Sequence, residues 1–162
     1  MFGLPVGIVS FMATTVNDIA RFHELVGQHL GWSDWHEITQ ETVNLFADAT
    51  GDHQWIHVDP EKALQGPFGG PIAHGYLTLS LAPVYLGDVL KVEGMSMGVN
   101  YGCNKVRFPS PVPVGSRLRL GAAVASVTDV QGGVQVELDL TLETEGSTKP
   151  SCVAQVVYRY FS

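Results

Sequence analysis

The chain has 162 residues, a length that fits one domain and is sufficient for a buried core. Hydrophobic residues make up 45% of it, charged residues only 15%, and the formal net charge is -7. The acidic balance argues against nucleic acid and anionic membranes as general partners. The small charged fraction suggests that part of the surface is covered, for example in a dimer.

Three features of the sequence bear on the compartment of the protein. Residues 1–16 are fairly apolar but contain no Lys or Arg, so they lack the basic start of a secretory signal. The longest uncharged run, residues 66–87, contains several prolines and glycines and is a poor membrane span. Cys103 and Cys152 show no metal spacing and are predicted to be buried, reduced thiols, with a disulfide as the alternative. We therefore expect a cytoplasmic protein.

The first half of the chain is predicted to be largely helical. Residues 1–16 are a leader without a clear structural signal, and residues 17–162 are predicted to form the single domain. Apolar residues at helical spacing indicate a helix over residues 18–28. Thr39 is a good N-cap for a helix that ends before Gly51. A strand is expected at residues 32–38 and a short helix at residues 60–64.

The second half combines one apolar helix with strands. Residues 72–90 are apolar on all sides, as in a buried helix, and Pro83 is expected to break it. Residues 134–142 alternate strictly, directly after a Gly-Gly turn at residues 131–133, which predicts a strand entered through a hairpin. Further strands are expected at residues 95–100, 105–108, 117–127 and 152–160. The sequence thus predicts an α+β hot-dog fold, an antiparallel sheet wrapped around a central apolar helix.

The segment between the two main helices concentrates acids, histidines and glycines. Asp52 and His57 lie five residues apart, and such a pair can exchange protons with one water near neutral pH. The alternative is that Asp52 caps a turn and His57 is a surface histidine. His53 and His57 have the i, i+4 spacing of metal ligands, but Pro60 leaves little room for a helix, and no metal site is predicted.

His74 and Gly75 stand at the start of the apolar helix. Backbone N–H groups there are free and partly positive, so the Gly75 N–H can stabilise an enolate. Alternatively, Gly75 only permits tight packing and His74 caps the helix. Phe46, Trp55 and Phe68 could line an acyl pocket, although aromatic residues more often belong to the core.

Positive charge is concentrated in the second half of the chain. Four basic residues could meet ligand phosphates, but the favoured interpretation is that they form solvated strand faces. They are Lys105, Arg107, Arg117 and Arg119.

Three segments together resemble the MaoC-like dehydratases, the (R)-specific enoyl-CoA hydratases or hydratase 2, and within them the nodulation protein N-like subgroup. The segments are residues 46–60, 69–75 and 106–115. The resemblance extends from about Trp35 to the C-terminus. It implies a lyase of fatty acid metabolism that reversibly hydrates trans-2-enoyl-CoA to (3R)-hydroxyacyl-CoA. It also implies that Asp52 and His57 activate the water and that the Gly75 N–H binds the thioester carbonyl.

This chain departs from the family motif at two positions. Asn and Pro are usual there, and Gln54 and Trp55 replace them, although the spacing from Asp to His is kept. The larger Trp55 is expected to change the shape of the pocket. The expected substrate contacts are therefore Gln54, Trp55, Phe68 and His74. The resemblance further implies an acyl-CoA or acyl carrier protein thioester as substrate, no cofactor, and a homodimer whose sheets join edge to edge.

Two other functions fit a hot-dog protein. One is an acyl-CoA thioesterase, but such enzymes often carry an acid on or beside the central helix, and residues 72–87 contain neither Asp nor Glu. The other is a non-catalytic acyl-CoA-binding module, against which the intact Asp/His pair argues.

Overall fold

The computed structural model describes residues 12–162, and most of the predicted leader lies outside this range. No helix within these residues is long and apolar enough to cross a membrane. The helices are α1 (Ile19–Glu24), α2 (Gln40–Thr50), α3 (Trp55–Val58), α4 (Pro60–Leu64), α5 (Gly75–Ser80) and α6 (Ala82–Leu86). The strands are β1 (Thr14–Val16), β2 (His29–Trp32), β3 (His36–Glu37), β4 (Leu90–Val92), β5 (Met97–Arg107), β6 (Arg117–Val130), β7 (Gly133–Thr144) and β8 (Cys152–Phe161).

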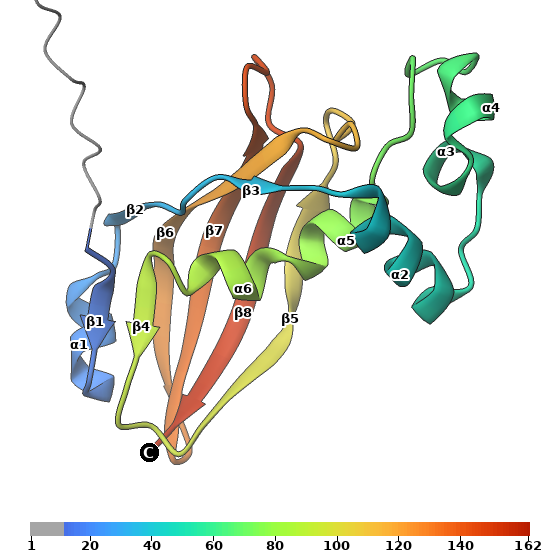
Figure 1. Cartoon of the computed structure of the whole chain (residues 1–162). Helices are drawn as coiled ribbons and strands as arrows, with labels where there is room; N and C mark the ends of the chain where they lie inside the picture. The colour runs from blue at the N-terminus through green and yellow to red at the C-terminus, as the bar shows by residue number, and fades with distance from the viewer. Residues whose placement is uncertain (1–11) are drawn as a thin grey trace, which may run out of the picture.

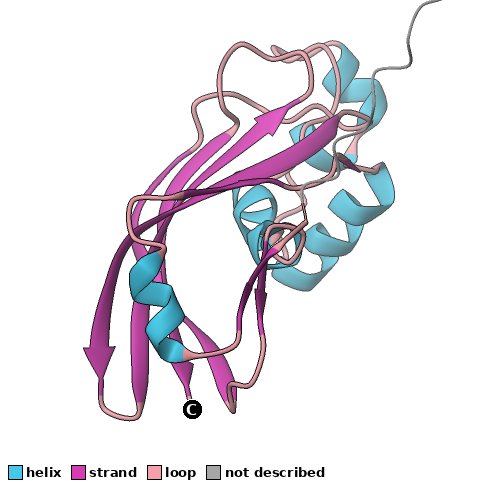
Figure 2. Ribbon diagram, turned by 90° about the vertical axis from the view of Figure 1, so that its left-hand side faces the viewer, coloured by secondary structure: helices cyan, strands magenta, loops and turns pink. Residues whose placement is uncertain are grey.

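The main sheet has six strands, with the order β2-β6-β7-β8-β5 and β3 paired to β6. Its neighbouring strands are antiparallel. The sheet curves, and the α5–α6 segment runs across its concave face, while α2, α3 and α4 lie beyond one end of that segment (Figures 1 and 2). The predicted α+β hot-dog fold is confirmed.

The alternation of apolar and polar residues along the strands explains why one face of the sheet packs against the helices. The apolar residues of β7 all face the core, and most of their partners on β6 and β8 do the same, since directly paired residues lie on the same face of a sheet. The exception is Asp129, the partner of Val134 near the end of β6, which is exposed. The buried set from these strands includes Leu118, Leu120, Val134, Val136, Leu138, Leu140, Leu142, Cys152 and Val156. Leu77, Tyr85 and Leu86 from the central segment pack into the same core.

The central apolar segment is two short helices in place of one. Pro83 falls in the first turn of α6, where its missing N–H costs no hydrogen bond. Leu81 lies between the two helices. The break predicted from Pro83 is confirmed, and the helical part begins at Gly75.

The N-terminal part differs from expectation in three ways. In place of the one strand predicted at residues 32–38 there are two, β2 and β3, separated by residues 33–35. Thr14–Val16, assigned to the leader, form β1 and pair in parallel with β4. The helix predicted at residues 18–28 ends at Glu24, because Gly27 adopts a left-handed conformation with φ 80°. The division into leader and domain stays a prediction for residues 1–11.

Strand β5 also corrects two expectations. It is one continuous strand, with register shifts on both sides of Gly102 in place of the predicted gap. Cys103 is exposed on it, contrary to the prediction that both thiols are buried. Cys152 is buried as predicted, and both cysteines are free thiols.

Candidate active site

Asp52 is placed by the end of α2. The Thr39 side chain caps the start of this helix, and its last turn closes at Gly51, which has φ 80°. Both helix ends agree with the sequence prediction. Asp52 therefore leaves the helix on irregular backbone with an exposed side chain, a position from which functional groups are often presented.

His57 is held by its backbone and by one ring nitrogen. It lies in α3, where its carbonyl accepts a 2.7 Å hydrogen bond from the Gln40 side chain. The ring is buried, and its Nδ1 lies 2.7 Å from the Ile72 carbonyl oxygen. Because a carbonyl only accepts, Nδ1 carries the proton and Nε2 keeps a free lone pair. His57 is thus presented as a base at Nε2.

The segment before α5 is fixed between α3 and the connector from β5 to β6. The Ile72 N–H donates to the Ile56 carbonyl at 3.0 Å, and the Ala73 N–H donates to the Val112 carbonyl at 2.8 Å. This clamping keeps the Ile72 carbonyl in place for His57, and it positions the first residues of α5.

His74 is at the N-cap of α5, but its side chain makes no capping bond. Its Nε2 donates instead to the backbone carbonyl of Asp52, at 2.9 Å. The ring is 3% exposed and stacks on His57, with 3.8 Å between the ring centroids and an interplanar angle of 26°. Its Nδ1 is buried without a hydrogen-bond partner.

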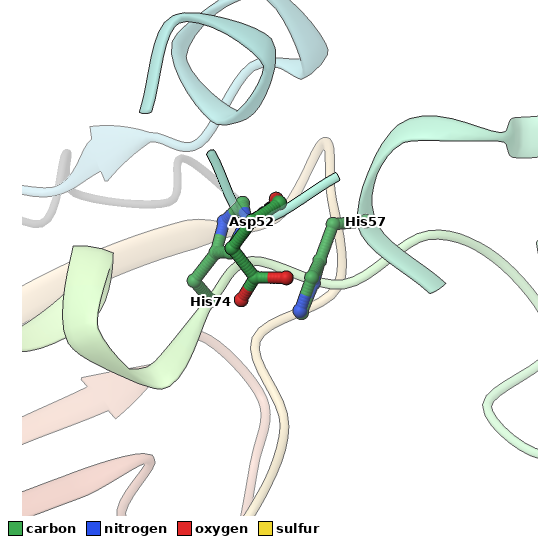
Figure 3. Close-up of side chains that lie close together, drawn as sticks. All are labelled: Asp52, His57 and His74. Carbon is green, nitrogen blue, oxygen red and sulfur yellow. Dashed lines mark hydrogen bonds between the residues drawn. The ribbon is translucent and has the colours of Figure 1, made fainter. Parts of the chain in front are cut away.

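Asp52, His57 and His74 form one cluster, with one candidate ligand atom from each within 4.8 Å of the others. Figure 3 shows an Asp52 carboxylate oxygen directed toward the His57 ring. These residue types can hold a metal ion, but an imidazole lone pair lies in its ring plane. Two stacked, nearly parallel rings do not direct lone pairs at one ion about 2 Å away. The geometry favours acid–base chemistry.

Burial sets the protonation of His57. Desolvation lowers the pKa of its imidazole below the ordinary value of 6.5, and the nearby His74 lowers it further. The hydrogen bond to Ile72 and the Asp52 carboxylate act in the opposite direction but do not prevail. The ring is therefore uncharged at neutral pH, as a general base must be.

A cavity of about 290 Å³ opens beside this cluster. Of the expected site residues, His57, Phe68 and Gly75 line this cavity. The rest of its lining is Ile72, Ala73, Thr78, Phe108, Pro109, Ser110, Pro111, Val112 and Ser151. As the first residue of α5, Gly75 has an N–H without an acceptor inside the helix.

Three of the four expected substrate contacts do not line the cavity, and the buried His74 is one of them. Gln54 is exposed, and Trp55 packs between the Lys62 ammonium, 5.0 Å from its ring, and Gly66. Neither lines the cavity. The Trp55 ring thus packs against α4 and against Gly66 just after it, and it does not form part of the wall of this cavity.

Sequence reasoning missed the far wall of the cavity. Thr78 and Ser151 are buried polar residues, and Phe108 covers Gly75. Thr78 lies one helical turn after His74, a spacing that places both on one side of α5. Phe108 belongs to the segment 106–115 that carries part of the family resemblance, so that segment was a usable signal.

Two of the four basic residues, Arg117 and Arg119, make contacts within the sheet itself. Arg117 pairs with Glu145, and Arg119 pairs with Glu143, across β6 and β7. The Arg119 guanidinium also lies 4.4 Å from the Trp32 ring and 4.5 Å from the Trp35 ring. These contacts agree with the interpretation as strand faces.

A curved sheet around a buried helix, with an imidazole lining one cavity and a carboxylate close to that imidazole, is the arrangement of a hot-dog protein with a candidate acid–base site. Residues 21–146 match the family model of the MaoC like domain. The chain therefore belongs to the MaoC-like dehydratase family, as its motifs predicted.

Named relatives agree with this membership. The chain is 54% identical over 147 residues to 3-hydroxyacyl-thioester dehydratase Z of Mycobacterium tuberculosis, which covers 90% of this chain and 97% of that protein. It is 46% identical over 133 residues to nodulation protein N of Rhizobium leguminosarum, covering 80% and 82%. Among solved structures, an R-hydratase from Pseudomonas aeruginosa matches with a TM-score of 0.66 and 23% identity, over 85% of this chain and 82% of that one.

Proposed function

We propose that this enzyme catalyses the reversible hydration of trans-2-enoyl-CoA to (3R)-hydroxyacyl-CoA. The observation that carries the proposal is the uncharged His57, which lines a mainly apolar cavity, keeps Nε2 free and lies in one cluster with the Asp52 carboxylate. The similarity to a 3-hydroxyacyl-thioester dehydratase over nearly the whole chain supports it.

In the proposed mechanism, one water lies between Asp52 and His57. His57 Nε2 accepts a proton from the water, while the Asp52 carboxylate accepts its second hydrogen in a hydrogen bond and orients it. The oxygen of the water forms a bond to C3 of the enoyl thioester, and the proton held by His57 is returned to C2. The elements of water are thus added across the double bond, and dehydration follows the same steps in reverse.

The negative charge that develops on the thioester oxygen during addition needs a donor. The Gly75 N–H is such a donor, because it lines the cavity and has no acceptor within α5. Preorganised backbone donors of this kind are worth about 10²–10³-fold in kcat. Gly75 therefore acts as the carbonyl-binding group in the proposed mechanism.

The test is an assay of the purified protein with crotonyl-CoA, in which loss of the enoyl absorbance reports hydration and chiral analysis identifies the product. We expect the absorbance to fall and the product to be the 3R enantiomer. A 3S product would contradict the stereochemical assignment. Release of free CoA thiol without hydration would support a thioesterase, and binding without turnover a non-catalytic module.

We further propose that two copies of the chain join through β5. This strand is an edge of the six-stranded sheet, so half of its backbone groups lack a sheet partner among the described residues. Met97 and Tyr101 on it are exposed, at 52% and 58%. Antiparallel pairing of two β5 strands would cover both. Light scattering is expected to give about twice the chain mass of 17.5 kDa, and a mass of one chain would contradict this pairing.

A further inference from the structure

His74 joins the two sides of the candidate active site. It enters from the start of α5, yet it touches Asp52, 22 residues earlier, and His57, 17 residues earlier. It does not line the cavity, and its ring is almost completely buried. These contacts suggest a role that is exerted through its neighbours and not on the substrate.

The hydrogen bond from His74 is the best anchor of residue 52. The Asp52 N–H lies 3.4 Å from the Thr50 hydroxyl, and the Asp52 carboxylate lies 3.3 Å from the Gln54 N–H. Both distances are long for hydrogen bonds. The bond from His74 Nε2 to the Asp52 carbonyl is 2.9 Å. Because Asp52 is otherwise exposed after a helix end, this bond fixes the backbone from which its carboxylate projects.

The His74 ring also supports His57. The Ile72 carbonyl holds one edge of the His57 ring, and the stacked His74 ring covers one of its faces. Phe46 contacts His74 in turn, with 4.9 Å between the ring centroids. Rotation of the His57 ring, which would redirect Nε2, is therefore opposed by both contacts.

Packing alone does not explain a histidine at this position. A buried acceptor without a partner lowers the stability of the folded state, and His74 Nδ1 is such an acceptor. An apolar ring would fill the same space without this cost, but it would lose the donor to Asp52.

On the basis of the function proposed above, we propose that His74 is a positioning residue, which holds the Asp52 carboxylate and the His57 imidazole at the distance that one water requires. His74 also directly precedes Gly75, so the same short segment positions the Gly75 N–H that binds the thioester carbonyl in the proposed mechanism. The three groups of the proposed mechanism are thus tied together through one buried ring.

Two substitutions separate the two contacts. His74→Gln keeps a donor that can reach the Asp52 carbonyl but removes the ring, whereas His74→Phe keeps a ring but removes the donor. We expect each to lower kcat for crotonyl-CoA hydration by about 10- to 100-fold, since small displacements of catalytic groups have effects of this size. KM should change much less. His23→Gln, at an exposed histidine on α1, is the matched control and should retain full activity.

The pH profile gives a readout that a purely structural role would not move. The titratable side chains that face His57 are Asp52 and His74, and among the described residues no other titratable side chain lines the cavity. Burial and His74 both lower the pKa of His57. His74→Gln loosens the burial and removes the ring whose electrostatic effect lowers this pKa, so the pKa of His57 should rise. The fall of kcat on acidification should then begin at a higher pH than in the native enzyme.

Nitrogen NMR of the histidine rings tests the inference without any turnover. We expect Nδ1–H for His57, Nε2–H for His74, and a higher His57 pKa in His74→Gln. If the native enzyme hydrates no enoyl thioester, the proposed function fails, while these ring states still test the contacts of His74. If both variants keep native kcat and an unchanged pH profile, or if the NMR shows other tautomers, the positioning role is overturned.

Discussion

Substitution of either member of the acid–base pair is expected to lower kcat for enoyl-thioester hydration by about 10³-fold, within the usual range for general acid–base groups. His57→Asn is the informative change at the base, because the amide can still donate to the Ile72 carbonyl, now 2.7 Å from Nδ1, but offers no base in place of Nε2. Asp52→Asn keeps the shape of the carboxylate and removes its charge. The measurement is kcat with crotonyl-CoA for each purified variant.

Matched controls exist for both changes. Asp48→Asn alters another exposed acid near the end of α2, four residues before Asp52. Asp48 pairs with His53 and lies outside the cluster of Asp52, His57 and His74. His23→Asn alters an exposed histidine that pairs with Asp129. Both controls should keep native kcat. Native activity in Asp52→Asn or His57→Asn would remove that residue from the mechanism.

The sequence was most informative where the cause of a structure is local. Thr39 and Gly51 mark the ends of α2 through capping and a left-handed backbone, and both ends were predictable. The period-two pattern of residues 134–142 predicts which face of β7 is buried, because neighbouring side chains in a strand point to opposite sides. Pro83 marks the break in the central helix for an equally local reason.

Contacts between distant segments could not be read in this way. The stack of His57 on His74 depends on how the clamp at Ile72 and Ala73 brings α5 against α3. Trp55 shows the same limit, because its place in the motif suggested the pocket, whereas its ring packs against Lys62 and Gly66. Residue types indicated the chemistry of the site, and tertiary packing decided which of them meet.

Gly75 is the position where the two interpretations of the sequence, tight packing and carbonyl binding, now separate. Its φ is not positive, so no backbone strain requires a glycine there. A Cβ at this residue would lie 2.9 Å from Cδ2 of Phe108, which is too close. The ring also lines the cavity, so an added methyl group would affect both the packing of Phe108 and the approach of a substrate oxygen to the Gly75 N–H.

Gly75→Ala is expected to lower kcat by up to about 10²–10³-fold, the usual effect of an oxyanion donor, because the added methyl group keeps the substrate oxygen away from the N–H. The protein should still fold, because Ala favours the helical backbone and restricts the unfolded chain. Thermal unfolding of the variant checks this expectation, and kcat with crotonyl-CoA measures the loss.

Phe108→Ala distinguishes packing from carbonyl binding, because it removes the ring that the new methyl group would strike. If Gly75 is needed for carbonyl binding, the double variant Gly75→Ala/Phe108→Ala should stay about 10²-fold below Phe108→Ala alone, since the methyl group still stands beside the N–H. Equal kcat for these two variants would show that glycine serves only to make room for Phe108. The proposal that carbonyl binding requires a glycine at residue 75 would then fail, while the roles of Asp52 and His57 would stand.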